Sequence, residues 1–278
     1  MFKSKFRYFF LVLFLACCST STLSQSLEER LNAFYKSLYK PLTSKPEIVD
    51  SLGFNISNKV VKPAGDGPFP AVVLIHTAGG LANGHIKKHA QNLLSKGYVV
   101  YVMDSMGPRG YSVINDSARS MFFPTGVKDA YDALDFLNQQ SFVDKNRIYE
   151  AGMSWGGFVA SLLGSKTYAA VNGAKQRFRA SVSFYSSCSY GPYKMIYEDT
   201  DMPVLMLLAG ADKELKHGNC FKELEEYKKN GLPIDFFIYE GIGHGWDKMG
   251  ETQLGYIYNE EITKDSFNRM VEFFEKNK

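Results

Sequence analysis

Three stretches of this sequence are continuously apolar and rich in β-branched or leucine side chains. They occupy residues 70–76, 97–104 and 202–210. A strand without alternating polar residues is buried on both faces, as in a parallel sheet covered by helices. Patterns with helical spacing fall between these runs, as at residues 83–96 and 125–140. The sequence therefore predicts an α/β fold, with a mostly parallel central sheet and helices on both faces.

The remaining elements continue this alternation along the chain. No linker or repeat interrupts it, so residues 44–278 are predicted to form one domain, with a helical arm at 26–43 before it. Further strands are expected at residues 54–63, 146–152, 179–187 and 234–240, and further helices at 26–39, 154–164, 217–230 and 263–278.

Composition and charge indicate which kinds of molecule the protein can bind. The 278 residues are 45% hydrophobic and 22% charged, which is ordinary for a globular protein. The formal net charge is +3, and the charges are spread along the chain. Because binding to nucleic acid requires a concentrated basic patch, no nucleic-acid partner is expected, and the charged residues are interpreted as a mixed, solvated surface.

Residues 1–25 have the features of a secretory signal peptide. Lys3, Lys5 and Arg7 form a positive segment, residues 9–16 are apolar, and a polar tract of Ser, Thr, Leu and Gln follows. The apolar run is about half as long as a membrane-spanning helix. The sequence therefore predicts an exported protein, periplasmic or secreted.

Cys17 and Cys18 leave an alternative to simple cleavage. The residues around them resemble a bacterial lipoprotein signal, in which a lipidated cysteine anchors the protein to a membrane. Phe14 fits such a signal poorly three positions before Cys17, and Cys17 fits poorly directly before Cys18. Cleavage without lipidation is favoured, and anchoring through either cysteine stays open.

Two cysteines, Cys188 and Cys220, remain once the leader is removed. An even number of cysteines in an oxidising compartment favours a disulfide, the alternative being two unpaired buried thiols. The two residues are 32 positions apart. Closing a loop of this length stabilises a fold by about 3 kcal/mol in the chain-entropy model.

A G-x-S-x-G motif surrounds Ser154, between a predicted strand and a predicted helix. In this context the serine lies on a sharp turn that exposes its hydroxyl, and the flanking glycines allow neighbouring elements to approach closely. Ser154 is therefore the predicted nucleophile. The alternative is a simple turn residue in a glycine-rich connection.

A serine hydroxyl needs a base to take its proton, and the base needs an acid to orient it. His244 follows the last predicted strand in a glycine-rich loop, and Asp212 follows the preceding strand. The order Ser154, Asp212, His244 is the order of an α/β-hydrolase triad. Glu214 is the second candidate acid, expected to lie outside the site. Taken one at a time, Asp212 could instead be a helix cap, and His244 could instead be a loop histidine without a catalytic role.

The other four histidines are not expected to take part in catalysis. His85, His89 and His217 are expected on the solvated surface. His76 is expected to brace its loop by hydrogen bonds. His85 and His89 are four residues apart, but they lack the intervening Glu and the third ligand of a zinc site, so no metal is expected.

Backbone amides are the expected oxyanion hole. One donor is Trp155, which follows the nucleophile, and the other is Ala78, in the loop after the first buried strand. Such amides stabilise the charge that develops on the carbonyl oxygen, and losing one typically costs about 3 kcal/mol of transition-state stabilisation.

From about Ser44 to Lys278 the chain resembles the dienelactone hydrolase family of α/β-hydrolases, in an exported, serine-nucleophile branch. The resemblance rests on the stretches HTAGG, MDSMGPRG, GMSWGG, AGADKE and GIGHGW. It implies the α/β-hydrolase fold and hydrolysis, and the pairing of Cys188 with Cys220 is similar to that of exported members. The founding members use a cysteine nucleophile and a glutamate in the oxyanion loop, where this chain has Ser154 and Thr77. A dienelactone substrate is therefore not implied.

The predicted activity is hydrolysis of a small carboxylic ester or lactone through an acyl-enzyme, without metal or organic cofactor. Arg109, Thr77 and Trp246 are predicted substrate contacts; for Arg109 the favoured alternative is bracing of its own tight turn. Rival functions are amide or small-peptide hydrolysis, acyl transfer on the same triad, and a non-catalytic binding protein on the same scaffold. The sequence shows no room for a large cap, which favours small substrates. Oligomeric state is not predicted.

Overall fold

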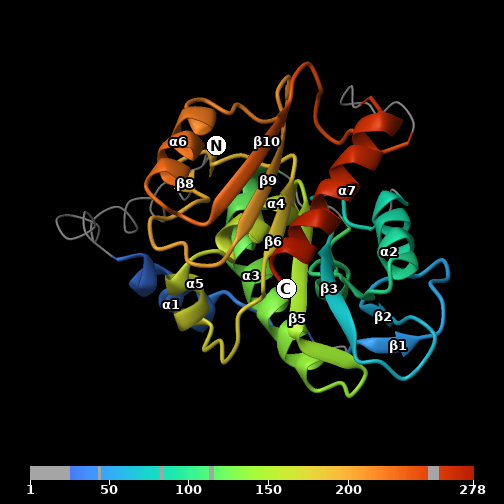
Figure 1. Ribbon diagram of the computed structural model, residues 1–278. Coiled ribbons are helices and arrows are strands. Elements are labelled where there is room, and N and C mark those ends of the chain that lie inside the picture. The colour runs from blue at the N-terminus through green and yellow to red at the C-terminus, as the bar shows by residue number, and fades with distance from the viewer. Residues whose placement is uncertain (1–25, 43–44, 82–83, 113–115, 250–256) are drawn as a thin grey trace, which may run out of the picture.

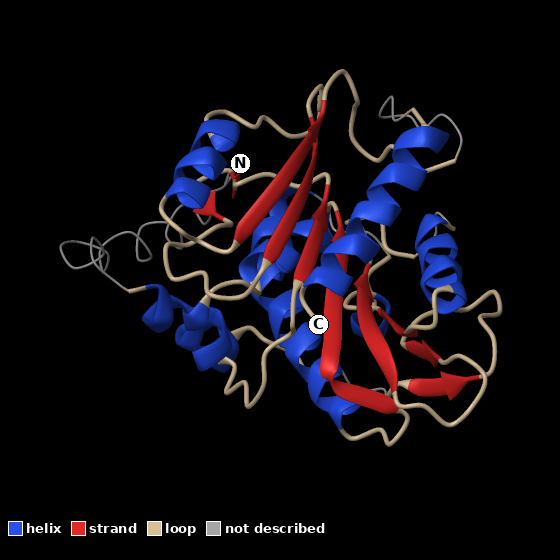
Figure 2. Ribbon diagram, viewed as in Figure 1, coloured by secondary structure: helices blue, strands red, loops and turns tan. Residues whose placement is uncertain are grey.

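The computed structural model describes residues 26–42, 45–81, 84–112, 116–249 and 257–278. An eight-stranded sheet runs through the molecule in the order β1-β2-β4-β3-β5-β6-β9-β10 (Figure 2). Its strands are β1 Glu47–Val49, β2 Lys59–Val61, β3 Phe69–Ile75, β4 Val99–Met103, β5 Val143–Met153, β6 Ser181–Phe184, β9 Val204–Ala209 and β10 Ile234–Tyr239.

Helices cover both faces of this sheet (Figures 1 and 2). The α2 and α7 helices lie on one face, where Ile86 and Phe274 pack into one apolar core. The other α-helices pack on the opposite face in a second core. The predicted α/β fold is confirmed. The helices are α1 Leu27–Ser37, α2 His85–Ser95, α3 Asp116–Asn138, α4 Trp155–Leu162, α5 Lys166–Val171, α6 Cys220–Lys229 and α7 Glu260–Lys276, with a 3₁₀ turn η1 at Gly107–Arg109.

The register of the sheet brings the candidate site residues to one edge. From β4 to β10 every neighbouring pair of strands is parallel. Ser154, Asp212 and His244 follow β5, β9 and β10 in the chain, so all three come from the carboxyl ends of parallel strands. Ligands of open α/β sheets bind at this edge.

Several elements differ from expectation. The β1 strand, which was not predicted, extends the edge of the sheet beside β2; the antiparallel pairing of β2 with β4 is consistent with a mostly parallel sheet. The α3 helix begins at Asp116, with Pro124 inside it, although the sequence predicted a start after that proline. The short α5 helix and the two-stranded hairpin of β7 (Ser189–Tyr190) and β8 (Tyr193–Lys194) were not predicted, because segments this short carry little periodicity.

The N-terminal arm forms a helix that docks on the domain. Ser26 and Glu29 form a capping box at the start of α1. The Tyr35 hydroxyl donates to the carbonyl of Pro124 at 2.9 Å and accepts from Asn172 at 3.1 Å. Residues 1–25, with the predicted leader and the cysteines at 17 and 18, lie outside the described residues. Within the described part of the chain, no helix combines the length and apolar character needed to cross a membrane.

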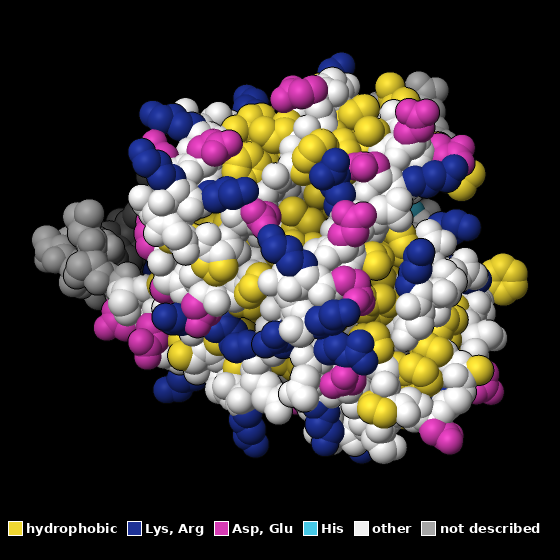
Figure 3. All heavy atoms as spheres, viewed as in Figure 1, with side chains coloured by type: hydrophobic (Ala, Val, Ile, Leu, Met, Phe, Trp, Pro, Cys, Tyr) yellow, Lys and Arg dark blue, Asp and Glu magenta, His cyan; other side chains and the backbone are white. Residues whose placement is uncertain are grey.

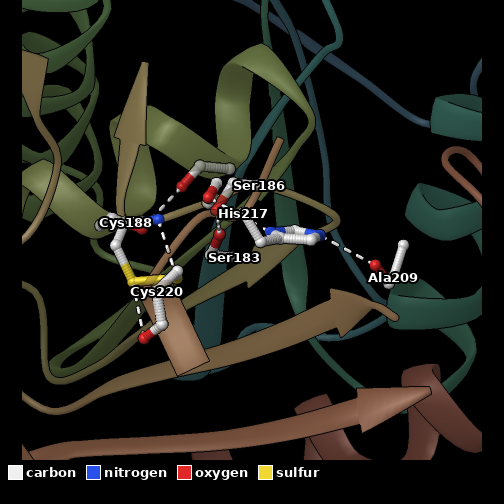
Figure 4. Close-up of a disulfide and its surroundings, with 9 residues drawn as sticks. Ser183, Ser186, Cys188, Ala209, His217 and Cys220 are labelled. Atoms are coloured by element: carbon white, nitrogen blue, oxygen red, sulfur yellow. Dashed lines mark hydrogen bonds between the residues drawn. A yellow bond between two sulfur atoms is a disulfide. The ribbon is translucent and has the colours of Figure 1, made fainter. Parts of the chain in front are cut away.

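The predicted pairing of Cys188 with Cys220 is confirmed. The S–S distance is 2.05 Å, and the bridge ties the segment after β6 to the start of α6 (Figure 4). His217 lies beside it and donates from Nε2 to the carbonyl of Ala209 at 2.8 Å. On the molecular face of Figure 3, acidic and basic side chains are interspersed rather than segregated.

Candidate active site

Ser154 lies on a strained turn between β5 and α4. Its φ and ψ are 53° and −107°, a backbone conformation that residues other than glycine rarely adopt. The turn is possible because glycines surround it. A Cβ at Gly152 would lie 2.0 Å from the carbonyl oxygen of Gly156, and one at Gly156 would lie 2.7 Å from that of Ile75. The flanking glycines therefore allow neighbouring backbone segments to approach closely, as the motif predicts.

The three residues predicted to form a triad are in hydrogen-bond contact. His244 Nε2 lies 2.8 Å from Ser154 Oγ, and His244 Nδ1 lies 2.7 Å from Asp212 Oδ2. Because the carboxylate can only accept, Nδ1 carries the proton and Nε2 is left to accept from the serine hydroxyl. The imidazole is thus in the tautomer that a general base requires.

Asp212 is held as a charged acceptor. Its other oxygen, Oδ1, accepts from the backbone N–H groups of Glu214 and Leu215, both at 2.9 Å. Burial favours the neutral acid, but the hydrogen bonds from His244 and from the two amides outweigh it, so the pKa of Asp212 is lowered. The carboxylate therefore stays ionised beside the imidazole.

Glu214 lies closer to the site than expected. Its Oε2 is 3.7 Å from His244 Nε2, so the expectation that it lies outside is wrong. The reason is local: Asp212 Oδ1 caps the turn that follows β9, and this turn brings residue 214 toward the imidazole.

Of the two amides predicted as an oxyanion hole, Ala78 lies in the loop after β3 and Trp155 is the first residue of α4. In the backbone hydrogen bonds of the described residues, the N–H groups of Ala78 and Trp155 donate to no carbonyl. The Thr77 carbonyl accepts from Gly80 N at 2.9 Å and from His76 Nδ1 at 2.7 Å. Because a peptide C=O and the following N–H point in opposite directions, these two bonds also orient the Ala78 N–H.

His76 braces this loop, as the sequence analysis expected. Its Nε2 accepts from the backbone N–H of Ser105 at 3.2 Å, and its ring stacks on Trp155 with 5.4 Å between centroids. Burial lowers the pKa of His76, although nearby Asp104 opposes the effect. A neutral ring is consistent with donation from Nδ1 and acceptance at Nε2.

The three residues predicted to contact substrate all form hydrogen bonds within the protein. Arg109 pairs with Asp129 through NH1 at 2.7 Å and NH2 at 2.8 Å, and donates from Nε to the carbonyl of Lys40. The Thr77 hydroxyl accepts from Gly79 N at 3.2 Å. Trp246 is fully buried and donates from Nε1 to a serine of α7. A substrate contact by Arg109, Thr77 or Trp246 stays a prediction.

The expectation that three histidines lie on the surface is wrong. His85 and His89 are 4% and 3% exposed, because their shared face of α2 packs onto the sheet. His217 is half-buried and links Ser187, in the segment after β6, to Ala209 at the end of β9. Among the described residues, no group of three or more His, Cys, Asp or Glu side chains could hold a metal ion.

Sequence reasoning missed two buried residues behind His244. The Tyr185 ring lies 4.9 Å from the imidazole, centroid to centroid, and its hydroxyl donates to Asp247 Oδ1 at 2.8 Å. The sequence carries a signal for Asp247 only, as a charged residue three positions after the base. Tyr185 ends an apolar strand and is not distinguished from a core residue.

Comparison with known proteins identifies the family of this chain. The dienelactone hydrolase family profile matches residues 56–277. A dienelactone hydrolase-like promiscuous phosphotriesterase from metagenomic libraries has a TM-score of 0.60 and 19% identity over 77% of this chain and 88% of its own. An α/β-hydrolase from a Medee basin deep-sea metagenome library has a TM-score of 0.56 and 21% identity over 75% of this chain and 84% of its own.

A thermophilic esterase from the planctomycete Thermogutta terrifontis, solved with propionate bound, is also similar. Its TM-score is 0.56, with 17% identity over 78% of this chain and 88% of its own. At these identities the structures show a shared fold. The family profile covers well over half of the sequence, and Ser154, Asp212 and His244 all fall inside the matched residues. The chain therefore belongs to the dienelactone hydrolase family and is a carboxylic ester hydrolase of that family.

Proposed function

We propose that the protein hydrolyses a small carboxylic ester or lactone through an acyl-enzyme on Ser154, with His244 as base and Asp212 as its orienting acid. One observation carries the proposal: the continuous contact from Asp212 Oδ2 through the imidazole to Ser154 Oγ, at 2.7 and 2.8 Å. A hydroxyl in such a contact, on a strained and largely buried turn, is the arrangement of an activated nucleophile.

In the first half-reaction, His244 Nε2 takes the hydroxyl proton as Ser154 Oγ bonds to the ester carbonyl carbon. The carbonyl electron pair moves to oxygen, where the N–H groups of Trp155 and Ala78 stabilise the charge. The intermediate then collapses. The carbon–oxygen bond to the alcohol breaks, and Nε2 returns its proton to that oxygen.

In the second half-reaction, a water molecule takes the place of the alcohol. His244 Nε2 removes one of its protons as the water oxygen bonds to the acyl carbon. The bond to Ser154 Oγ then breaks, the serine recovers the proton, and the carboxylic acid leaves. Asp212 keeps the imidazole in one tautomer and stabilises its charged form throughout.

The test is covalent labelling. The wild-type protein, Ser154→Ala and His244→Ala are treated with a fluorophosphonate probe, and the adduct is mapped by mass spectrometry. Organophosphorus reagents suit the test because the similar Thermogutta terrifontis esterase 2 was solved phosphonylated by sarin. We expect labelling of wild-type Ser154 and almost none in either variant. A folded wild-type protein that resists labelling would refute the proposal.

The same protein is then assayed on p-nitrophenyl esters of increasing acyl length. Turnover with labelling at Ser154 supports ester hydrolysis, whereas labelling without turnover supports the rival activities on amides or acyl acceptors. Ser154→Ala serves as the background for each ester.

We also propose that the protein works outside the cytoplasm, because a disulfide bond persists in oxidising compartments. The predicted leader supports this reading. Mass spectrometry of the mature N-terminus distinguishes simple cleavage from lipidation at Cys17 or Cys18. A mature protein that retains Met1 would contradict export by this route.

A further inference from the structure

A buried polar network lies beside the imidazole of His244. Tyr185 follows β6 directly and adopts a φ of 40°, a left-handed conformation that is rare for a tyrosine. Its ring meets the imidazole edge-on, with 4.9 Å between centroids and 68° between planes. A residue held in a strained conformation against a candidate base suggests a positioning role.

The hydroxyl of Tyr185 is anchored by Asp247. It donates to Oδ1 at 2.8 Å, and His89 Nε2 donates to Oδ2 at 2.7 Å, so both carboxylate oxygens are bonded. Burial alone would raise the pKa of Asp247, but its hydrogen bonds to His89 and Tyr185 and the charges of His85 and His89 lower it to about 2. The carboxylate is therefore a permanent acceptor.

The anchor belongs to the same loop as the base. Asp247 comes three residues after His244, and Trp246 between them packs on Tyr185 at 4.9 Å between centroids. Trp246 Nε1 donates to Ser266 Oγ of α7 at 3.1 Å. The base loop is thus fixed to α2, α7 and the end of β6 by buried contacts.

Hydrogen bonds at Nδ1 and Nε2 do not by themselves hold the imidazole rigidly, because the side chain can swing about its Cα–Cβ and Cβ–Cγ bonds as the hydrogen bonds bend and stretch. Such a swing would tilt the Nδ1–H away from Asp212 and the Nε2 lone pair away from Ser154. A ring packed against the imidazole restricts this motion, and Tyr185 packs there edge-on.

We propose that Tyr185, held by Asp247 and His89, is a positioning residue that fixes the plane of the His244 imidazole. The proposal rests on the proposed role of His244 as the base. It predicts that the tyrosine hydroxyl matters through its hydrogen bond to Asp247, because without this anchor the ring no longer holds one position.

The test compares Tyr185→Phe with a matched control. Tyr98→Phe also removes a hydroxyl that donates to a carboxylate, that of Glu275, from a ring that is 2% exposed. It is not in contact with the site. Asp247→Asn tests the anchor from its other end. For each variant, kcat, KM, the rate of fluorophosphonate labelling and the melting temperature are measured.

We expect Tyr185→Phe to lower kcat and the labelling rate about tenfold with KM unchanged, since small misplacement of a catalytic group has effects of this size or larger. Asp247→Asn should act in the same direction, and Tyr98→Phe should change only the melting temperature. If Tyr185→Phe and Asp247→Asn both match Tyr98→Phe in kcat and labelling, the positioning role is overturned.

A readout without turnover separates this inference from the proposed function. The proton between His244 Nδ1 and Asp212 is followed by its low-field NMR resonance, assigned by its loss in His244→Ala. We expect a shifted or exchange-broadened resonance in Tyr185→Phe and an unchanged one in Tyr98→Phe. An unchanged resonance in Tyr185→Phe would overturn the positioning role even if the wild-type protein hydrolysed no ester.

Discussion

The carboxylate of Glu214 lies 3.7 Å from Nε2 of His244, the ring nitrogen that also contacts Ser154. Asp212 holds the opposite nitrogen, Nδ1, at 2.7 Å. Two acids therefore flank one imidazole on different sides. Only an acceptor at Nδ1 fixes the tautomer in which Nε2 can take a proton, so the two carboxylates are expected to differ greatly in importance.

The first prediction separates these two acids. Asp212→Asn should lower kcat about 10⁴-fold, as expected when the base is held in the wrong tautomer. Glu214→Gln should change kcat by less than about tenfold, because it leaves the Nδ1 contact intact. Steady-state kinetics on one p-nitrophenyl ester gives both values. A larger loss in Glu214→Gln than in Asp212→Asn would reassign the acid.

The second prediction concerns His76. His76→Phe keeps a ring beside Trp155 but removes the bonds to the Thr77 carbonyl and the Ser105 amide. Because these bonds orient the Ala78 N–H, we expect kcat to fall about 10- to 100-fold with little change in KM. This fall in kcat is smaller than the fall expected when an oxyanion-hole donor is removed altogether. His217→Phe, which also removes loop hydrogen bonds, is the control and should retain kcat.

The third prediction is a pH dependence of stability caused by Glu150. This residue is fully buried, and burial raises its pKa well above 4.5. The folded state then holds a proton that the unfolded state releases above pH 4.5, so stability falls as pH rises from there toward the folded pKa. Glu150→Gln should be more stable than wild type at pH 7, and the difference should vanish below about pH 4. Urea unfolding at several pH values checks this; a constant difference would contradict it.

The fourth prediction concerns the buried pair of Arg109 and Asp129. Arg109→Met should destabilise the protein by about 3–5 kcal/mol, because it leaves the Asp129 carboxylate, 0% exposed, without its cation. The double variant Arg109→Met, Asp129→Leu should recover most of the loss, since hydrophobic residues can replace a buried ion pair. Chemical denaturation measures both. Equal losses would show that the guanidinium contributes through its other bonds, such as that to Lys40.

The fifth prediction concerns the disulfide. Replacing Cys188 and Cys220 together by alanine should lower stability by about 3 kcal/mol, because the unfolded chain regains the entropy of an open 32-residue loop. Reduced wild type should show a similar loss. If the double variant unfolds at the same denaturant concentration as the oxidised wild type, the bridge does not stabilise the fold.

The sequence predicted the features that repeat or that stand in a fixed order. The buried strands were found because they lack polar alternation, and Ser154, Asp212 and His244 were chosen because each follows a strand. Both signals are local, so one chain is enough to detect them. The disulfide was predicted from cysteine count and compartment.

The errors concern contacts between distant segments. Whether His89 faces solvent depends on the packing of α2 against Phe184 and Phe267, which lie elsewhere in the chain. For Arg109 the favoured bracing role agrees with its bonds to Asp129 and to the carbonyl of Lys40, although neither of these distant partners can be deduced from a turn motif. Burial of a polar side chain is a tertiary property, and spacing alone did not reveal it.

The close packing around the turn at Ser154 determines which substitutions this turn can accept. At Gly152 and Gly156 any side chain would collide with backbone atoms, whereas residue 154 already carries a Cβ that the turn accommodates. Replacing the serine oxygen by sulfur leaves that Cβ and the whole turn in place. The founding members that this chain resembles carry cysteine at this position. The turn can therefore present either a hydroxyl or a thiol at the proposed nucleophile position, whereas a side chain at either flanking glycine would force the backbone to move.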